Sequence, residues 1–289
     1  MKLSISLTDY AWPQKPADHL DTVARAADSG GIDTIWVPDH LIQAQPGLPE
    51  TDPMLEAFTT LGYLAARTNR VRLGTMVAAT TFRSPALLVK AVTTLDVLSG
   101  GRAWFGVGAG HHAGEAVGLG LDVPTTAERF DRLDETLQIA LRMFSGDERP
   151  FLGDHYRLER PLNQPNSVQR PHPPILIGGM GERRTLPLVA QYADACNLGD
   201  VPDGGATITR KLGVLARHCA DVGRDYAEIE KTVSTRLLPG ETAAEFADRC
   251  RTLVDLGLQH VVVIASGPWT PQRLSPLLDA APRLAEVAA

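Results

Sequence analysis

The feature that most constrains the fold is an alternation of short apolar runs with amphipathic segments along the chain. Runs such as 2–7 and 33–37 are each followed by apolar residues at helical spacing, and glycine or proline punctuates the boundaries. Eight such alternations can be counted in 289 residues. Near-continuous apolar strands are typical of a parallel sheet covered by helices, and eight strands close such a sheet. We therefore expect a single (β/α)8 TIM-barrel domain over 1–289, with an open doubly wound sheet as the alternative.

The alternation is interrupted between residues 146 and 173. This stretch is rich in Pro, Asn and Gly, and it contains FLGDHYRLERPL, which is typical of a small β-hairpin. We interpret 146–173 as an insertion with a hairpin. The repeats then resume and end in an expected helix over 271–287.

Composition argues against several kinds of partner. The formal net charge is −6, whereas nucleic-acid and membrane surfaces require clustered Lys and Arg. The first residues read as a strand rather than a signal peptide, and no apolar run approaches the length that spans a membrane. Three widely spaced cysteines without a CxxC pair predict reduced thiols and a cytoplasmic protein.

Active sites of such barrels lie at the carboxyl ends of the strands, so the residues that follow each strand are the candidates. Asp39 and His40 follow the second strand, where a carboxylate can hydrogen-bond a cofactor and an imidazole can move a proton. A capping aspartate and a surface histidine are the alternative. After the third strand, Gly74 and other small residues let a planar ring approach the backbone, or form a bulge that helps to close the barrel.

The fourth strand is followed by GVGAGHHAGE. Its alternating glycines, of which Gly108 is the middle one, suggest a dinucleotide loop, but His111 stands where the GxGxxG pattern needs its last glycine. Adjacent histidines point apart on most backbones, so His111, His112 and Glu115 make a poor metal site and we expect none. One histidine is expected to face a substrate pocket, and the other to be solvated or to cap a turn.

The best anion site in the sequence follows the fifth strand, at GGMGERR. Three glycines precede an expected helix over 182–191, whose first turn contains Glu182, Arg183 and Arg184. Amides at a helix N-terminus, glycines that permit close approach and an arginine together suit a phosphate group. The alternative is a glycine turn into a capped helix.

Three motifs in this order resemble the luciferase-like superfamily, and within it the deazaflavin (coenzyme F420)-dependent oxidoreductases. They are IWVPDHL, LGTMVAATTFRSPALLVKAVTTLDVLSGGRAWFGVGAG and GGMGERRTLPLVAQYADACNL, and the similarity covers almost the whole chain. The resemblance implies that a tricyclic ring lies in the barrel mouth beside Asp39 and His40. It also implies a bulge over Thr75–Val77 behind the ring, with a non-proline cis peptide at Met76-Val77, and a phosphate tail that runs to the loop after the fifth strand.

The residues that would contact the cofactor follow from this resemblance and from the anion site. They are Asp39, Thr75, Met76, Val77, Gly108, Gly178, Gly179, Met180, Gly181, Glu182, Arg183, Cys196 and Asn197. Coenzyme F420 is the expected cofactor and FMN the alternative.

The function implied by the resemblance is hydride transfer between the deazaflavin ring and a small organic substrate. We expect His40 and His111 to be catalytic, with His40 moving a proton, and Trp12 and His112 to contact the substrate. Related sugar-phosphate dehydrogenases have a glutamate where this chain has His111, which argues against a sugar phosphate. An FMN-dependent monooxygenase and a non-catalytic flavin-binding barrel are the alternatives, and the resemblance also predicts a homodimer.

Overall fold

Parallel strands from all parts of the chain form one closed sheet in the computed structural model, which describes residues 1–13 and 15–286. The order around the sheet is β3-β2-β1-β11-β10-β9-β8-β5, and β3 pairs with β5 to close the ring. Because β4 continues the third strand, the ring has eight positions and the predicted TIM barrel is confirmed. The strands are β1 (Lys2–Ser6), β2 (Thr34–Val37), β3 (Arg72–Thr75), β4 (Ala78–Ala79), β5 (Ala103–Gly108), β8 (Ile175–Gly178), β9 (Ala195–Gly199), β10 (Glu230–Arg236) and β11 (His260–Ile264).

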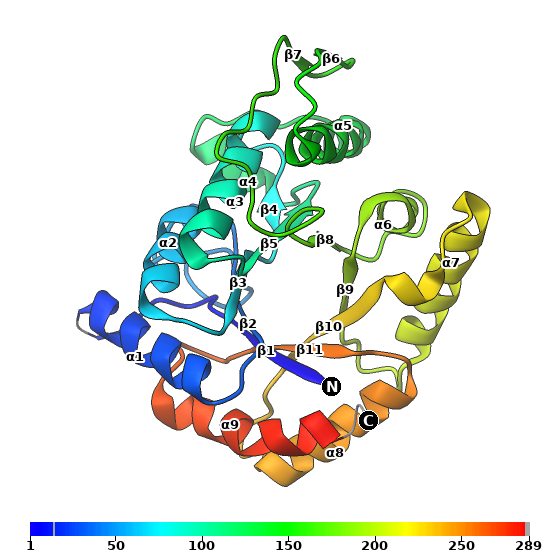
Figure 1. Cartoon of the computed structure of the whole chain (residues 1–289). Helices are drawn as coiled ribbons and strands as arrows, with labels where there is room; N and C mark the ends of the chain where they lie inside the picture. The colour runs from blue at the N-terminus through cyan, green and yellow to red at the C-terminus, as the bar shows by residue number, and fades with distance from the viewer. Residues whose placement is uncertain (14, 287–289) are drawn as a thin grey trace.

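Helices surround this sheet (Figure 1). No helix among the described residues is both long and apolar enough to cross a membrane. The short α4 stands where the sequence suggested only a loop, and residue 287, the expected end of the last helix, lies outside the described residues. The helices are α1 (Pro16–Ser29), α2 (Ala57–Arg67), α3 (Pro85–Ser99), α4 (Ala113–Gly118), α5 (Thr126–Ser145), α6 (Thr185–Tyr192), α7 (Ala206–Val222), α8 (Ala243–Asp255) and α9 (Pro271–Glu286), with a 3-10 turn η1 (Tyr226–Glu228).

Two tryptophans fill the centre of the barrel. The rings of Trp36 from β2 and Trp104 from β5 lie 5.5 Å apart, and both are buried. A Cβ atom at Gly74 would lie 2.6 Å from the Cβ of Trp104 and 2.8 Å from the ring of Trp36. Glycine is therefore required at position 74 by packing inside the barrel, and this explains it without a cofactor.

Buried carboxylates fasten the long connection over 146–173 to the helices. Within it β6 (Phe151–Leu152) and β7 (Arg157–Leu158) pair antiparallel and project beyond α5 (Figure 1). Glu135 of α5 accepts hydrogen bonds of 2.7 to 3.2 Å from the backbone N–H groups of residues 154–156. Asp96 of α3 accepts bonds of 2.7 and 3.0 Å from the N–H groups of Val168 and Gln169. These carboxylates satisfy backbone donors that no strand pairing would satisfy.

Another buried polar network lies at the amino ends of β1, β10 and β11. His260 is fully buried, its Nδ1 lies 2.7 Å from Oε1 of Glu230, and its Nε2 contacts the hydroxyl of Ser4. Lys2 donates to the other oxygen of Glu230 at 2.7 Å. Burial alone would raise the pKa of Glu230, but the hydrogen bond and charge of His260, together with Lys2, lower it to about 2.

We predict that this network stabilises the fold at neutral pH and not in acid. A carboxyl whose pKa is lower in the folded than in the unfolded chain contributes stability above its unfolded pKa of about 4.3. The contribution, on the order of 3 kcal/mol, is lost as the pH falls from there towards about 2. Free energies of urea unfolding for wild type and Glu230→Gln should therefore differ at pH 7 and converge towards pH 3. A difference that stays constant over this range would contradict the prediction.

Candidate active site

One extra residue in the third barrel strand shapes the carboxyl-terminal mouth of the barrel. Both β3 and β4 pair with β5, but their registers differ by one residue, which defines a β-bulge between them. The bulge lies at Thr75–Val77, where the sequence predicted it. The peptide bond between Met76 and Val77 is cis, which confirms that prediction as well.

Val77 occupies space that side chains would need on the two neighbouring strands. A Cβ atom would lie 2.8 Å from Val77 Cγ2 at Gly108, and 2.9 Å from Val77 Cγ1 at Gly178. At Gly106 it would lie 1.8 Å from the carbonyl oxygen of Thr75. The sequence interpretation explained glycines of this region by close approach of a ligand. In the structure, these three are already required by the bulge.

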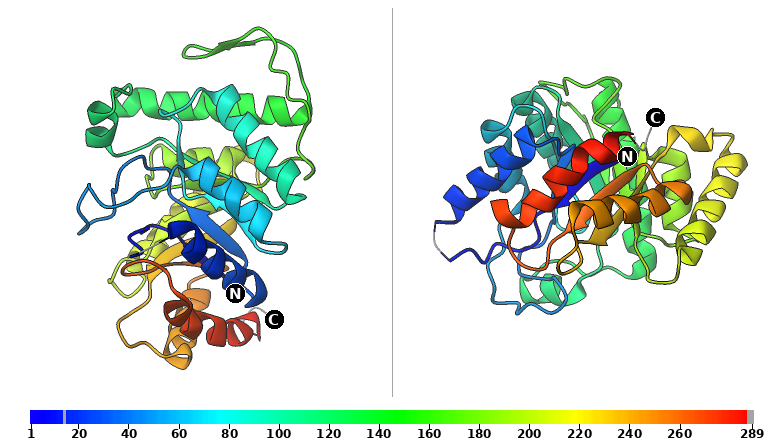
Figure 2. Two further views of the ribbon diagram at one scale, coloured as in Figure 1. Left: turned by 90° about the vertical axis from the view of Figure 1, so that its left-hand side faces the viewer. Right: turned by 90° about the horizontal axis from the view of Figure 1, so that it is seen from below.

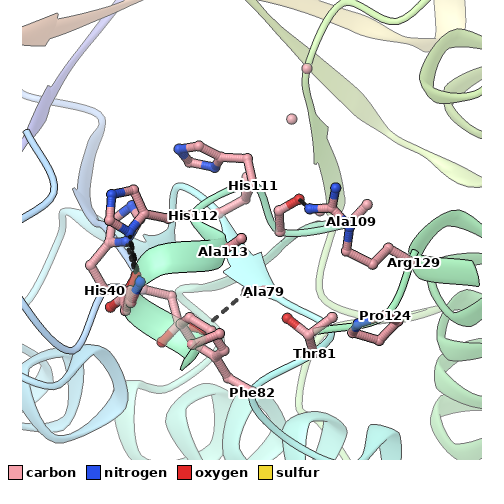
Figure 3. Close-up of a pocket in the computed structure, with 18 of the residues that line it drawn as sticks. His40, Ala79, Thr81, Phe82, Ala109, His111, His112, Ala113, Pro124 and Arg129 are labelled. Atoms are coloured by element: carbon pink, nitrogen blue, oxygen red, sulfur yellow. Dashed lines mark hydrogen bonds and ion pairs between the residues drawn. The ribbon is translucent and has the colours of Figure 1, made fainter. Parts of the chain in front are cut away.

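A cavity of about 380 Å³ opens above the bulge at the carboxyl ends of the strands (Figure 3). Many of the residues predicted from the sequence line it, and several that were not predicted line it as well. The predicted residues are Asp39, His40, Met76, Val77, Gly108, His111, His112, Gly178, Gly179 and Asn197. The others include Thr81, Phe82, Glu115, Arg129 and Thr185.

Trp12 is not brought to this cavity, which corrects its assignment to the substrate. Its side chain is 7% exposed, its Nε1 donates to the carbonyl of Trp269 at 2.9 Å, and its ring stacks on His19. These contacts hold the indole within the loop between β1 and α1, away from the walls of the cavity.

Six residues predicted to contact a cofactor lie outside the cavity walls. Two of them have another structural role, since the hydroxyl of Thr75 donates to the carbonyl of Gly106 at 2.6 Å and the side chain of Cys196 is buried in the core. Burial raises the pKa of the Cys196 thiol to about 12. The six are Thr75, Met180, Gly181, Glu182, Arg183 and Cys196. Contact of Thr75 with the ring of a cofactor, and of the other five with its tail, stays a prediction.

The loop after β8 differs from the helix start expected at residue 182. Glu182, Arg183 and Arg184 form a turn, and α6 begins at Thr185. Two cations of α7 pair with Glu182, and Arg184 pairs with Asp131 of α5 at 3.1 Å. These tertiary ion pairs hold the charged side chains outside the helix, so Thr185 rather than Glu182 lies beside the cavity.

Three histidines gather on one side of the cavity (Figure 3). The ring of His40, which follows β2, lies 5.5 Å from that of His111 and 6.0 Å from that of His112, both of which follow β5. Partial burial, together with the charges of His40 and His112, lowers the pKa of His111. A neutral imidazole at His111 is therefore favoured near neutral pH. His112 also caps α4, because its Nδ1 accepts a hydrogen bond of 3.3 Å from the N–H of Glu115.

Glu115 orients His40, a role that the sequence interpretation missed. This carboxylate of α4 is fully buried, and its Oε2 lies 2.7 Å from Nδ1 of His40. Its Oε1 accepts hydrogen bonds from the N–H groups of Leu41 and Ile42. A carboxylate on Nδ1 holds the hydrogen at that nitrogen, so Nε2 of His40 is the nitrogen that can exchange a proton with a ligand.

Asp39 is buried beside Arg83, which the sequence did not mark either. Nη1 of Arg83 lies 2.6 and 2.9 Å from the two carboxylate oxygens, and the N–H of Ala79 donates to one of them at 3.1 Å. Burial raises the pKa of Asp39, and the hydrogen bonds from Arg83 oppose this rise. Arg83 also binds Glu56 at 2.7 Å. Asp39 therefore holds β4 and the following loop in place while lining the cavity.

Arg129 of α5 lines the cavity on a different side from the histidines (Figure 3). Its Nη1 donates to the carbonyl of Gly110 at 2.5 Å and its Nη2 to the hydroxyl of Thr126 at 3.0 Å. Its Nε is buried without an acceptor in the described chain. Among the described residues that line the cavity, Arg129 is the only arginine or lysine. It therefore offers a charged donor to an anionic or carbonyl oxygen.

Comparisons with known proteins find a matching family model, similar relatives and a similar solved structure. The family model described as Luciferase-like monooxygenase matches residues 3–278. Two relatives named F420-dependent glucose-6-phosphate dehydrogenase are each 30% identical: that of Kineococcus radiotolerans over 85% of this chain and 70% of its own length, and that of Amycolatopsis mediterranei over 77% and 65%. The solved structure of an F420-dependent secondary alcohol dehydrogenase with an F420-acetone adduct superimposes with a TM-score of 0.83 at 18% identity, covering 98% of this chain and 99% of that one.

The contact between Val77 and Gly178 predicts a reciprocal effect on stability. Gly178→Ala should lower the free energy of unfolding by about 1 to 3 kcal/mol, because the added methyl group overlaps the side chain of Val77. Adding Val77→Ala to the same chain should recover part of this loss, which thermal and urea unfolding of the single and double variants would measure.

Gly62→Ala is the matched control, since a Cβ atom at this helical glycine of α2 meets nothing within 4 Å. It should be neutral or stabilising. Additive effects of the Val77 and Gly178 substitutions would show that the two sites are not coupled through this contact.

Proposed function

The chain belongs to the luciferase-like monooxygenase family, and we propose that it is an F420-dependent oxidoreductase that transfers a hydride between the deazaflavin ring and a small organic substrate. The observation that carries the proposal is the position of His40, oriented by the buried carboxylate of Glu115, beside a cavity floored by the bulge. The names of the relatives, which are F420-dependent dehydrogenases, support the choice of cofactor.

The shape of the cavity floor fits a planar cofactor. Met76 and Val77 present the bulge to the cavity, and Gly108 and Gly178 beside them carry no side chain that would rise above it. We propose that these residues hold the ring, and that Gly179 and Asn197 lie where the tail of the cofactor leaves the cavity. When bound, F420 supplies a ring carbon that accepts or gives a hydride and reacts poorly with oxygen.

The residues of this chain handle the proton that accompanies the hydride. Nε2 of His40 accepts the proton of a substrate hydroxyl during oxidation and returns it to the carbonyl oxygen during reduction. The carboxylate of Glu115 holds the imidazole of His40 in the same orientation through these steps. His111, favoured in its neutral form, orients the substrate oxygen by a hydrogen bond. We assign proton transfer to these imidazoles, because an imidazole can both accept and return a proton near neutral pH.

The substrate that we propose for this cavity is less charged than a sugar phosphate. Phosphate groups are commonly held by several cations or by helix amides, whereas Arg129 is the only arginine or lysine among the described lining residues. The family resemblance also implies a glutamate at the position of His111 in sugar-phosphate dehydrogenases. We therefore propose a small alcohol or carbonyl compound, with an acceptor oxygen that Arg129 can bind.

We also propose that the protein is a cytoplasmic homodimer. Its three cysteines are buried and unpaired, which is typical of a reducing compartment.

A shallow groove between α1 and α2, which contains Leu20, Leu55 and Tyr63, is the surface that we propose for the dimer. Light scattering coupled to size exclusion would measure the mass of the particle.

Cofactor identity is tested by titrating the protein with F420 and with FMN under identical conditions and following fluorescence quenching. We expect clearly tighter binding of F420. Tighter binding of FMN would instead favour an FMN-dependent monooxygenase, and binding of neither would leave a barrel whose activity needs another explanation.

Replacing His40 or Glu115 should impair turnover without loss of the cofactor. We expect His40→Ala to lower kcat by about 10² to 10⁴. Glu115→Gln should lower kcat by about 10- to 100-fold, because the amide no longer fixes the hydrogen of His40 on Nδ1. The F420 dissociation constant should change by less than about twofold in both variants.

The control for these variants is Glu128→Gln, which removes a carboxylate that pairs with Arg132 on the surface of α5. It should leave kcat unchanged. Full turnover by Glu115→Gln would show that the carboxylate has no positioning role, whereas a parallel loss of F420 affinity and thermal stability would indicate a general structural defect.

A further inference from the structure

Of the three histidines in the cavity wall, His112 alone has no part in the proposed function. Its side chain is 31% exposed, and its ring centre lies 6.0 Å from that of His40 and 6.4 Å from that of His111 (Figure 3). The residue stands directly before α4, and its Nδ1 accepts a hydrogen bond of 3.3 Å from the N–H of Glu115. His112 is therefore the N-cap of the helix that carries Glu115.

This cap binds the main chain of the same residue whose side chain orients His40. Nδ1 of His112 accepts from the N–H of Glu115, and Nδ1 of His40 lies 2.7 Å from Oε2 of the Glu115 carboxylate. Because α4 has only six residues, its own hydrogen bonds are too few to make it stable by itself. The position of the carboxylate therefore depends on the cap and on the N–H groups of Leu41 and Ile42, which Oε1 binds.

The cap exists in one protonation state of the His112 ring only. A ring nitrogen that accepts a hydrogen bond carries no hydrogen, so the neutral ring has its hydrogen on Nε2. The caps of α5 and α8 are the hydroxyls of Thr125 and Thr242, which accept their bonds at any pH near neutrality. An imidazole loses its accepting nitrogen on protonation, and unperturbed imidazoles titrate between about pH 5 and 8.

Protonation of His112 also adds a donor beside the carboxylate that His40 uses. Nδ1 of His112 lies 3.8 Å from Oε2 of Glu115, the oxygen that contacts His40. With a hydrogen on this nitrogen, the ring repels the N–H of Glu115 and attracts Oε2. The carboxylate is then shared between two imidazoles, and the positive charge on His112 opposes protonation of His40.

The titratable groups around His112 come from three parts of the chain. They are His40 in the loop after β2, His111 in the loop after β5, and Glu115 on α4. The remaining charged side chains of the cavity wall have partners of their own: Asp39 pairs with Arg83, Asp122 with Arg132, and Arg129 donates to the carbonyl of Gly110. Glu115 is therefore the carboxylate that a charge on His112 would contact.

We propose that His112 is a positioning residue of the active site, whose neutral ring caps α4 and leaves Oε2 of Glu115 to His40. When solvent protonates His112 at Nδ1, the cap is lost and Oε2 gains a second donor, so the carboxylate holds the hydrogen of His40 on Nδ1 less firmly. This role needs no contact with the substrate. Its meaning for turnover rests on the proposed function, but the geometry is tested in the protein without cofactor or substrate, so failure of F420 to bind would leave the test unaffected.

The test is NMR of the histidine rings in the whole nitrogen-15-labelled chain, titrated from about pH 9 to pH 5. Ring nitrogen shifts distinguish the Nδ1–H, Nε2–H and protonated forms, and His40→Asn and His112→Asn identify the signals of the two rings by their loss. At high pH we expect the Nδ1–H form for His40 and the Nε2–H form for His112. As the pH falls, the signals of His40 should show a step at the midpoint of His112. Absence of this step would overturn the proposal.

Two replacements separate the cap from its titration. His112→Asn keeps an oxygen that can accept the N–H of Glu115 but cannot be protonated, so His40 should stay in the Nδ1–H form and lose the step. A step that survives in this variant would assign the coupling to His111 and overturn the proposal. His112→Ala removes the cap, and the Nδ1–H fraction of His40 should fall on the order of twofold. Equal signals of His40 in the Asn and Ala variants would contradict the role of the cap.

Thr242→Ala is the matched control, because it removes the hydroxyl that caps α8. The orange α8 and the blue-green α4 lie on opposite sides of the barrel in Figure 1 and in the left view of Figure 2. Thr242→Ala and His112→Ala should both lower the thermal midpoint of unfolding, but only His112→Ala should change the signals of His40. A change of the same size in Thr242→Ala would indicate a general loss of structure and overturn the assignment to the α4 cap.

Discussion

The extra residue in the third barrel strand is the constraint on which the active-site mouth depends. It turns Val77 towards two neighbouring strands, so that Gly108 and Gly178 must lack side chains, and it sets the Thr75 carbonyl against Gly106. Because these strands are already fixed by barrel closure, the floor of the cavity has little freedom to move. The side chains that carry out the chemistry lie on loops above this floor. There each side chain can be positioned separately for proton transfer.

The fold could be predicted from the sequence because it follows from a local pattern, the alternation of apolar strands and amphipathic helices. The bulge and the position of His40 could also be predicted, because they adjoin strand ends in recognisable motifs. Glu115 could not, because its role depends on a contact with His40, which lies 75 residues earlier in the chain. Arg129 stands inside a regular helix with nothing local to distinguish it. The error at Glu182 has the same origin, since distant cations of α7 hold its side chain outside the helix that local propensity favoured.

Buried charged side chains are paired to different extents at the two ends of the barrel. At the carboxyl ends, Asp39 and Glu115 have their partners within the chain and serve to position other groups. At the amino ends, Glu230 is equally well paired, whereas Lys231 is buried with little more than a carbonyl and an aromatic ring. Complete pairing fixes the geometry of a buried charged group, whereas incomplete pairing leaves part of its desolvation cost uncompensated.

Glu135 holds the long connection between α5 and β8 through its main chain, and this affects which of its surface residues can vary. The carboxylate binds the main chain of residues 154–156 rather than their side chains, and every amino acid except proline supplies the same N–H group. Gly153 is restricted, because a side chain there would overlap Glu135, and Tyr156 is restricted because its side chain packs against the core. The exposed side chains of Asp154 and His155 can therefore be exchanged, by natural drift or by loop grafting, while the anchor and the barrel beneath it stay as they are.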